Sequence, residues 1–179
     1  GEIMNNALSG SRGAAVSHIE PYIEADAIAA KTRELGAAIS ATHRARGTDD
    51  PLLLICVLRG SVMFFADLAR AIDVDVELEF LAVSSYVGTK STGEVRLKYD
   101  LSTELAGRHV LIVEDIVDTG LTMRYLLNAL QARSPASLGV CTLLHKPARQ
   151  QVELPLDHIG FVIEDRFVVG YGLDLDQLY

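Results

Sequence analysis

Three carboxylates, Glu114, Asp115 and Asp118, follow a short apolar run at residues 110–113 and are the side chains best placed to do chemistry. A Thr-Gly-Leu-Thr sequence comes next, at residues 119–122, and opens a segment with helical periodicity. In an open parallel sheet, ligands bind in the crevice beyond the carboxyl ends of the strands. We therefore expect residues 114–122 to line a ligand site.

The turn at residues 119–122 has the composition of a phosphate-binding loop. The first N–H groups of a helix have no partner within it, Thr119 and Thr122 add hydroxyls, and Gly120 lets the backbone approach an anion closely. Three carboxylates beside an anion site suit only a ligand that also carries hydroxyls, a cation or a developing positive charge. A sugar phosphate with Mg²⁺ supplies all three, and the pattern therefore predicts this class of ligand.

Other interpretations of this segment explain less of it. Asp118-Thr119-Gly120 matches the triplet of aspartic proteases, but that fold is all-β, and Glu114 and Asp115 would be unexplained. The Gly-x4-Gly-Lys-Ser/Thr phosphate loop is absent from the sequence. A purely structural interpretation makes the carboxylates solvated loop residues and Thr119 a helix cap. A lone Asp-Thr-Gly would favour that interpretation, whereas the full arrangement favours a ligand site.

Short apolar runs alternate with helical segments along the chain, a pattern that predicts a mainly parallel sheet covered by helices. Residues 1–17 are small and polar and are expected to form a loosely ordered extension, whereas residues 19–46 have helical periodicity with Gly36 as a candidate break. Residues 86–93 are typical of a mobile hairpin loop. We expect strands at 52–58, 76–85, 93–101, 109–115, 138–145 and 159–165, and further helices at 62–72 and 121–133.

The composition is that of one α/β domain spanning residues 1–179. Of these residues, 49% are hydrophobic and 22% charged, enough to bury a core without disulfides or structural metals. A net charge of −8 without a basic cluster argues against nucleic acid as a partner. Cys56 and Cys141 lie in apolar runs as free thiols, and neither a signal peptide nor a membrane-spanning run is recognisable. A cytoplasmic location without membrane contact is therefore expected.

From about residue 19 onward, the sequence resembles the type I phosphoribosyltransferases. Residues 110–123, VLIVEDIVDTGLTM, are similar to the family's signature for phosphoribosyl pyrophosphate (PRPP). Further matches indicate the hypoxanthine-guanine branch: Leu58-Arg59-Gly60-Ser61, Ser85-Tyr86, Leu144-His145-Lys146-Pro147 and FVVGYGLD at residues 167–174. The resemblance implies a mainly parallel twisted sheet flanked by helices, with a small hood and a flexible hairpin loop.

The same resemblance implies an activity in purine salvage. A Mg²⁺-dependent enzyme of this kind transfers the 5-phosphoribosyl group of PRPP to N9 of hypoxanthine or guanine, giving IMP or GMP and pyrophosphate. Family members form dimers or tetramers, so a homodimer or homotetramer is expected.

Roles for the acidic segment follow from the resemblance. It implies that Glu114 and Asp115 bind the ribose hydroxyls and that Asp118 manages the proton at N7 of the purine. Thr119-Gly120-Leu121-Thr122 would hold the 5-phosphate, mainly through main-chain N–H groups. Leu121 stands where relatives often have Lys.

The remaining matches imply the rest of the site. Arg59 and Gly60 would form the pyrophosphate loop, which in this family often carries a cis peptide, and Ser85 and Tyr86 would close over the reacting centre. Mg²⁺ would be held by Glu114, Asp115 and, through water, Asp174. For the purine, Lys146 would donate to O6, Phe167 would stack on the ring, and the main chain at Val168 would read its exocyclic edge.

Three alternatives stay open at this point. A phosphoribosyltransferase for uracil, orotate or adenine is disfavoured by Lys146 and by Phe167-Val168. A nucleic-acid-binding regulator on the same fold would need a basic face, which the net charge of −8 does not favour. A nucleotide-binding module without catalysis is disfavoured by Asp118.

Overall fold

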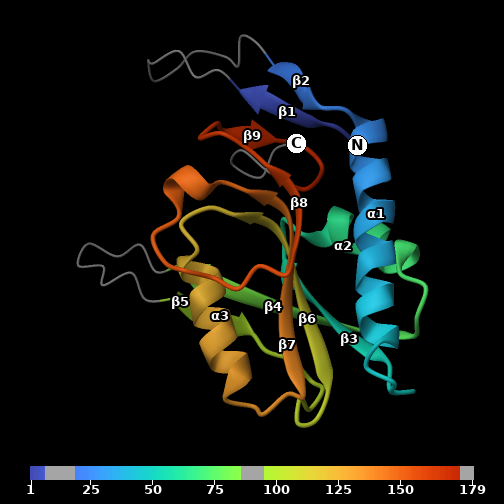
Figure 1. The fold of residues 1–179 in the computed structure, drawn as a ribbon. Helices are drawn as coiled ribbons and strands as arrows, with labels where there is room; N and C mark the ends of the chain where they lie inside the picture. The colour runs from blue at the N-terminus through green and yellow to red at the C-terminus, as the bar shows by residue number, and fades with distance from the viewer. Residues whose placement is uncertain (7–18, 86–94, 174–179) are drawn as a thin grey trace.

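The computed structural model describes residues 1–6, 19–85 and 95–173, and its larger sheet has six strands in the order β5-β4-β3-β6-β7-β8. Strands β4, β3, β6, β7 and β8 run parallel to one another, whereas β5 pairs antiparallel with β4 as one arm of a hairpin (Figure 1). The strands are β3 (Leu52–Leu58), β4 (Val76–Ser85), β5 (Val95–Tyr99), β6 (His109–Val117), β7 (Ser137–His145) and β8 (His158–Val162). All six predicted strands are present, with ends that differ by up to three residues.

Three helices cover the two faces of this sheet. Helices α1 (Ala25–Arg44) and α2 (Val62–Ala71) pack on one face, and α3 (Leu121–Gln131) packs on the other (Figure 1). Side chains of successive strand residues point to opposite faces. Along β3, Leu54 and Cys56 therefore join the core under α1 and α2, whereas Leu53 and Ile55 join the core under α3.

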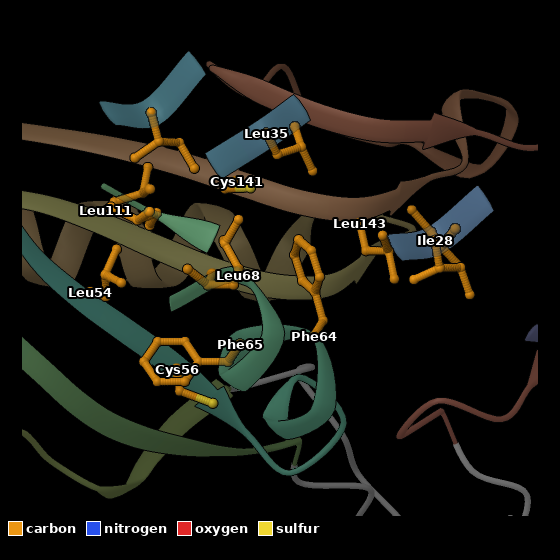
Figure 2. Packing of buried hydrophobic residues seen from close by; sticks show 14 of the residues in the cluster. Ile28, Leu35, Leu54, Cys56, Phe64, Phe65, Leu68, Leu111, Cys141 and Leu143 are labelled. Carbon is orange, nitrogen blue, oxygen red and sulfur yellow. The ribbon is translucent and has the colours of Figure 1, made fainter. Parts of the chain in front are cut away.

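Figure 2 shows the core under α1 and α2, where Phe64, Phe65 and Leu68 of α2 meet side chains of the sheet. Cys56 and Cys141 lie in this core as free, buried thiols, as the sequence predicts. Burial, together with Glu114 and Asp115 nearby, raises the pKa of Cys56 to about 12. The thiol therefore stays neutral and serves as a small apolar side chain.

Two expectations for the N-terminal part are wrong. Residues 19–23 do not belong to a helix but form strand β2 (Ile19–Ile23), which pairs with β1 (Ile3–Asn6) inside the stretch expected to be loosely ordered. Residues 7–18 lie outside the described residues. Helix α1 continues through Gly36 without a break. The glycine serves packing instead: it lets α1 approach α2, since an added Cβ would lie 2.5 Å from the Ala71 carbonyl oxygen.

A second, three-stranded sheet has the order β2-β1-β9 and joins the two ends of the chain. Strand β9 (Val168–Val169) pairs antiparallel with β1 through Met4↔Val169. This small sheet is the hood that the family resemblance implies, and it lies beside the carboxyl ends of the parallel strands (Figure 1). None of the described helices is long and apolar enough to cross a membrane.

Candidate active site

Two adjoining cavities lie at the carboxyl end of β6, where the sequence predicts the ligand site. One, of about 180 Å³, is lined by residues 114–120, Thr122 and Met123. The other, of about 320 Å³, is lined by Gly60, Asp115, Ile116, Asp118, Lys146, Phe167, Val168, Gly172 and Leu173. Asp115 and Asp118 line both cavities, and the structure thus brings together residues from β6, the end of β3, the end of β7 and the hood.

The acidic pair on β6 is held by a serine to which the sequence analysis gave no role. Ser61 is fully buried, donates a hydrogen bond of 2.9 Å to Oε1 of Glu114 and accepts one of 3.0 Å from the backbone N–H of Asp115. Burial first, and the adjacent Asp115 carboxylate second, raise the pKa of Glu114 well above its usual value, although Ser61 opposes this. Because burial and mutual repulsion disfavour two ionised carboxylates side by side, this pair favours a ligand that brings hydroxyl donors or a cation.

The expected phosphate loop has the geometry that its sequence predicts. Gly120 has a φ of +83°, a left-handed conformation that glycine adopts without strain, and it directly precedes α3. Gly120, Thr122 and Met123 line the smaller cavity beside Thr119, so the start of α3, where the first N–H groups have no partner in the helix, borders this cavity. Leu121 is 46% exposed and does not line the cavity, so its apolar side chain takes no part in holding an anion there.

Gly60 lies directly against the acidic pair. A Cβ at this position would be 2.1 Å from Oδ2 of Asp115, so only glycine leaves room for that carboxylate. A cis peptide bond precedes Arg59: it joins Leu58 to Arg59, one bond before the Arg59-Gly60 bond at the centre of the expected pyrophosphate loop.

The larger cavity contains a buried cation beside an aromatic ring. Lys146 is 6% exposed, and within the described parts of the chain its ammonium has no hydrogen-bond or ion-pair partner. Phe167 is 40% exposed and lies on the same cavity, next to the buried Val168 of the hood. A buried charge is costly unless it is paired, so the Lys146 ammonium favours a ligand with an acceptor oxygen at this point.

Asp118 has a contact that nothing in the sequence indicates. Nε of Arg149, in the 3-10 turn η1 (Pro147–Arg149), lies 2.8 Å from its Oδ1. The N–H group is not aligned with this oxygen, which is buried and accepts no hydrogen bond within the described residues, so the contact is an ion pair alone. No motif of the sequence points to Arg149, because an arginine three residues after Lys146 belongs to none of the family matches.

Three of the expected site residues are described in part or not at all. For Ser85, the structure describes only the backbone at the end of β4, and Tyr86 and Asp174 lie outside the described residues. The 86–93 loop, which would close over the site, also lies outside them.

Known proteins resemble this chain over most of its length. The family model of the phosphoribosyl transferase domain matches residues 22–176. A hypoxanthine phosphoribosyltransferase of Haemophilus influenzae is 45% identical over 161 residues, which is 89% of each chain. A hypoxanthine-guanine-xanthine phosphoribosyltransferase of Tritrichomonas foetus is 46% identical, over 86% of this chain and 82% of its own. The hypoxanthine phosphoribosyltransferase of Trypanosoma cruzi in complex with the product IMP superposes with a TM-score of 0.80, at 43% identity over 86% of this chain and 85% of that one.

Proposed function

The chain belongs to the phosphoribosyltransferase family, and from this membership and its two joined cavities we infer that it transfers the 5-phosphoribosyl group of PRPP to N9 of hypoxanthine or guanine. The products are IMP or GMP and pyrophosphate, and the reaction is a step of purine salvage. The single observation that carries the choice of base is the buried Lys146 beside Phe167, whose ammonium has no partner among the described residues. The ammonium can donate a hydrogen bond to the oxygen at C6 of hypoxanthine or guanine but not to the amino group of adenine.

The smaller cavity suits the sugar phosphate. The N–H groups at the start of α3, with Thr119 and Thr122, hold the 5-phosphate, and the carboxylates of Glu114 and Asp115 accept hydrogen bonds from the ribose hydroxyls. Gly60 lies against Asp115, and we assign the pyrophosphate to the loop of Arg59 and Gly60. Because Asp115 and Asp118 line both cavities, the anomeric carbon lies between the phosphate loop and the base.

Asp118 is the catalytic residue of this proposal. It lies between the two cavities, within reach of the purine N7, where it holds the proton while N9 attacks the sugar. The reaction inverts the anomeric carbon, with pyrophosphate leaving before the new bond is complete. Fixed charges then stabilise a cationic sugar on the carboxylate side and an anionic leaving group near Arg59.

The residues of the acidic pair also suit Mg²⁺. This ion prefers oxygen ligands and is usually bound through one or two carboxylates, substrate phosphates and waters. Glu114 and Asp115 offer such oxygens, and no cluster of three or more metal-binding side chains is present in the described parts of the chain. When bound, Mg²⁺ would neutralise charge on the leaving pyrophosphate, and Asp174 would orient its waters.

A homodimer or homotetramer forms part of the proposal. Met63 of α2 is 55% exposed, and Leu78 and Phe80, on one side of β4, are 46% and 37% exposed. Phe80 packs edge-on against Phe65 of α2, so Leu78 and Phe80 form an apolar area beside α2 that a second copy could cover. Sedimentation of the wild type and a Phe80→Lys variant tests this; a wild-type monomer would contradict it. The buried thiols agree with a location in the cytoplasm, where the salvage reaction would take place.

Chromatography of a reaction with PRPP, Mg²⁺ and hypoxanthine tests the function. The proposal predicts IMP and pyrophosphate in equal amounts, with no product when PRPP is omitted. An enzyme of established fold that forms no nucleotide from hypoxanthine or guanine would contradict it.

A further inference from the structure

We propose that Arg149 is a positioning residue, which holds the Asp118 carboxylate for the reaction and couples it to the segment that binds the purine. The proposal rests on the proposed function, since it assigns a role around the same catalytic carboxylate. The guanidinium of Arg149 lies between two carboxylates: its Nε is 2.8 Å from Oδ1 of Asp118, and its Nη1 is 3.7 Å from Oδ1 of Asp165.

Arg149 contacts Asp118 from outside the two cavities. It lines neither of them, whereas Asp118 lines both. Oδ1 of Asp118 is buried although its side chain is 38% exposed, which leaves Oδ2 as the carboxylate oxygen that can face a ligand. The guanidinium therefore holds the oxygen on the protein side and leaves the other free for the purine N7.

The second contact reaches the purine-binding segment. Asp165 precedes Phe167 by two residues, and Phe167 lines the larger cavity. An arginine can serve two carboxylates because its planar guanidinium presents several N–H groups in a fixed arrangement. Arg149 thus links the loop that carries the catalytic carboxylate with the segment that stacks on the base, and among the described residues it is the cation that pairs with both carboxylates.

The turn that carries Arg149 is held by contacts that do not involve its side chain. The N–H of Gln151 donates to the carbonyl of Thr119 at 2.9 Å, and His145 contacts the Gln150 side chain at 2.7 Å. Val152 and Leu154 pack against Gly120, where an added Cβ would lie 3.3 and 2.8 Å from their methyl groups. Because the Arg149 side chain is 49% exposed, truncating it should preserve the fold.

The test is steady-state kinetics of Arg149→Ala and Arg149→Lys beside the wild type. We expect kcat of the alanine variant to fall by roughly 10- to 100-fold, since misplacement of a reacting group by about 1 Å can cost about 100-fold. The KM for PRPP should change little, because Arg149 touches neither cavity. Lysine should restore part of kcat, and added guanidinium chloride at millimolar concentration should raise the rate of the alanine variant only.

Arg124→Ala is the matched control. Arg124 of α3 donates to the carbonyl of Glu153 in the same turn-and-loop segment but pairs with no carboxylate of the site in the described residues. It should keep its kcat. An equal loss in both variants, with no rescue by guanidinium, would mean that the segment is merely loosened and would overturn the proposal.

A double-mutant cycle with Asp165→Asn tests the coupling. If one guanidinium serves both carboxylates, Asp165→Asn lowers kcat in the wild type and adds little in the Arg149→Ala background. Full additivity, or a wild-type kcat in Arg149→Ala, would overturn the proposal while leaving the proposed function intact. A wild-type enzyme that forms no nucleotide would instead count against the proposed function itself.

Discussion

Gly60→Ala should disable the enzyme while leaving its fold intact. Gly60 does not have a positive φ, so alanine can adopt its backbone conformation, but the new Cβ would lie 2.1 Å from Oδ2 of Asp115. An ordinary carbon–oxygen contact is about 3.3 Å, so the carboxylate must move by about 1.2 Å. That movement strains the hydrogen bond of 2.8 Å that the Ile116 N–H donates to Oδ1 of Asp115.

The magnitude follows from the site that Asp115 serves. A displacement of about 1 Å at a reacting centre costs on the order of 100-fold in rate, so kcat/KM for PRPP should fall by about that factor. The unfolding temperature should change little, because the displaced group is a side chain at the edge of a cavity. Initial rates of IMP formation and a thermal unfolding curve measure the two quantities.

Gly36→Ala gives the opposite result and serves as the control. Its Cβ would lie 2.5 Å from the backbone oxygen of Ala71, where α1 crosses the far end of α2, so stability should fall and kcat/KM should hold. If Gly60→Ala kept wild-type kcat/KM, Asp115 could not have the role that the proposal gives it.

Three further perturbations address the base, the proton and the fold. Asp118→Asn should lower kcat by roughly 100- to 10,000-fold, the usual contribution of a general acid or base, and steady-state rates measure it. Lys146→Met removes a buried ammonium that has no partner in the described part of the chain, so the unfolding temperature should rise. Its kcat/KM for hypoxanthine should fall by roughly 10- to 150-fold, as for the loss of a hydrogen bond from a charged group worth about 1.5–3 kcal/mol. The free energy of unfolding should fall as the pH drops below about 6.5, because burial lowers the pKa values of His109 and His158 and the unfolded chain binds more protons there; urea titrations at several pH values measure this.

A contrary result for any of these three perturbations would remove the role that it tests. A Lys146→Met enzyme with wild-type activity on hypoxanthine would remove the argument for the 6-oxopurine. The pH dependence of the free energy of unfolding should weaken in His109→Gln. An unchanged dependence would mean that groups other than His109 cause it. For Asp118→Asn, full activity would contradict its role as the catalytic residue.

The elements around the active site could be predicted because their signals are local. Strand β3 and residues 110–113 of β6 are continuous apolar runs, and the turn at Gly120 needs a residue type that the sequence shows directly. The hood could not be predicted from patterning in this way. Its pairing of Met4 with Val169 joins the two ends of the chain through strands of four and two residues, too short to show an alternation.

Strand β2 and the Arg149 contact differ from what local spacing along the sequence predicts, each for a physical reason. Residues 19–23 continue the apolar spacing of α1, but Pro21 cannot donate a hydrogen bond and suits an edge strand, which is the place of β2 in its sheet. The Arg149 contact depends on how a single 3-10 turn directs one side chain toward β6, which spacing along the sequence does not encode.

Turnover with each of hypoxanthine, guanine, xanthine, adenine and uracil, with PRPP and Mg²⁺ supplied, tests the central claim most directly. The proposal predicts nucleotide formation from oxopurines. Adenine should give none, because Lys146 presents only donors to the base, and uracil should give none, because it lacks the N7 and N9 of a purine. Turnover of adenine or uracil at a comparable rate would contradict the assignment of the larger cavity to a 6-oxopurine.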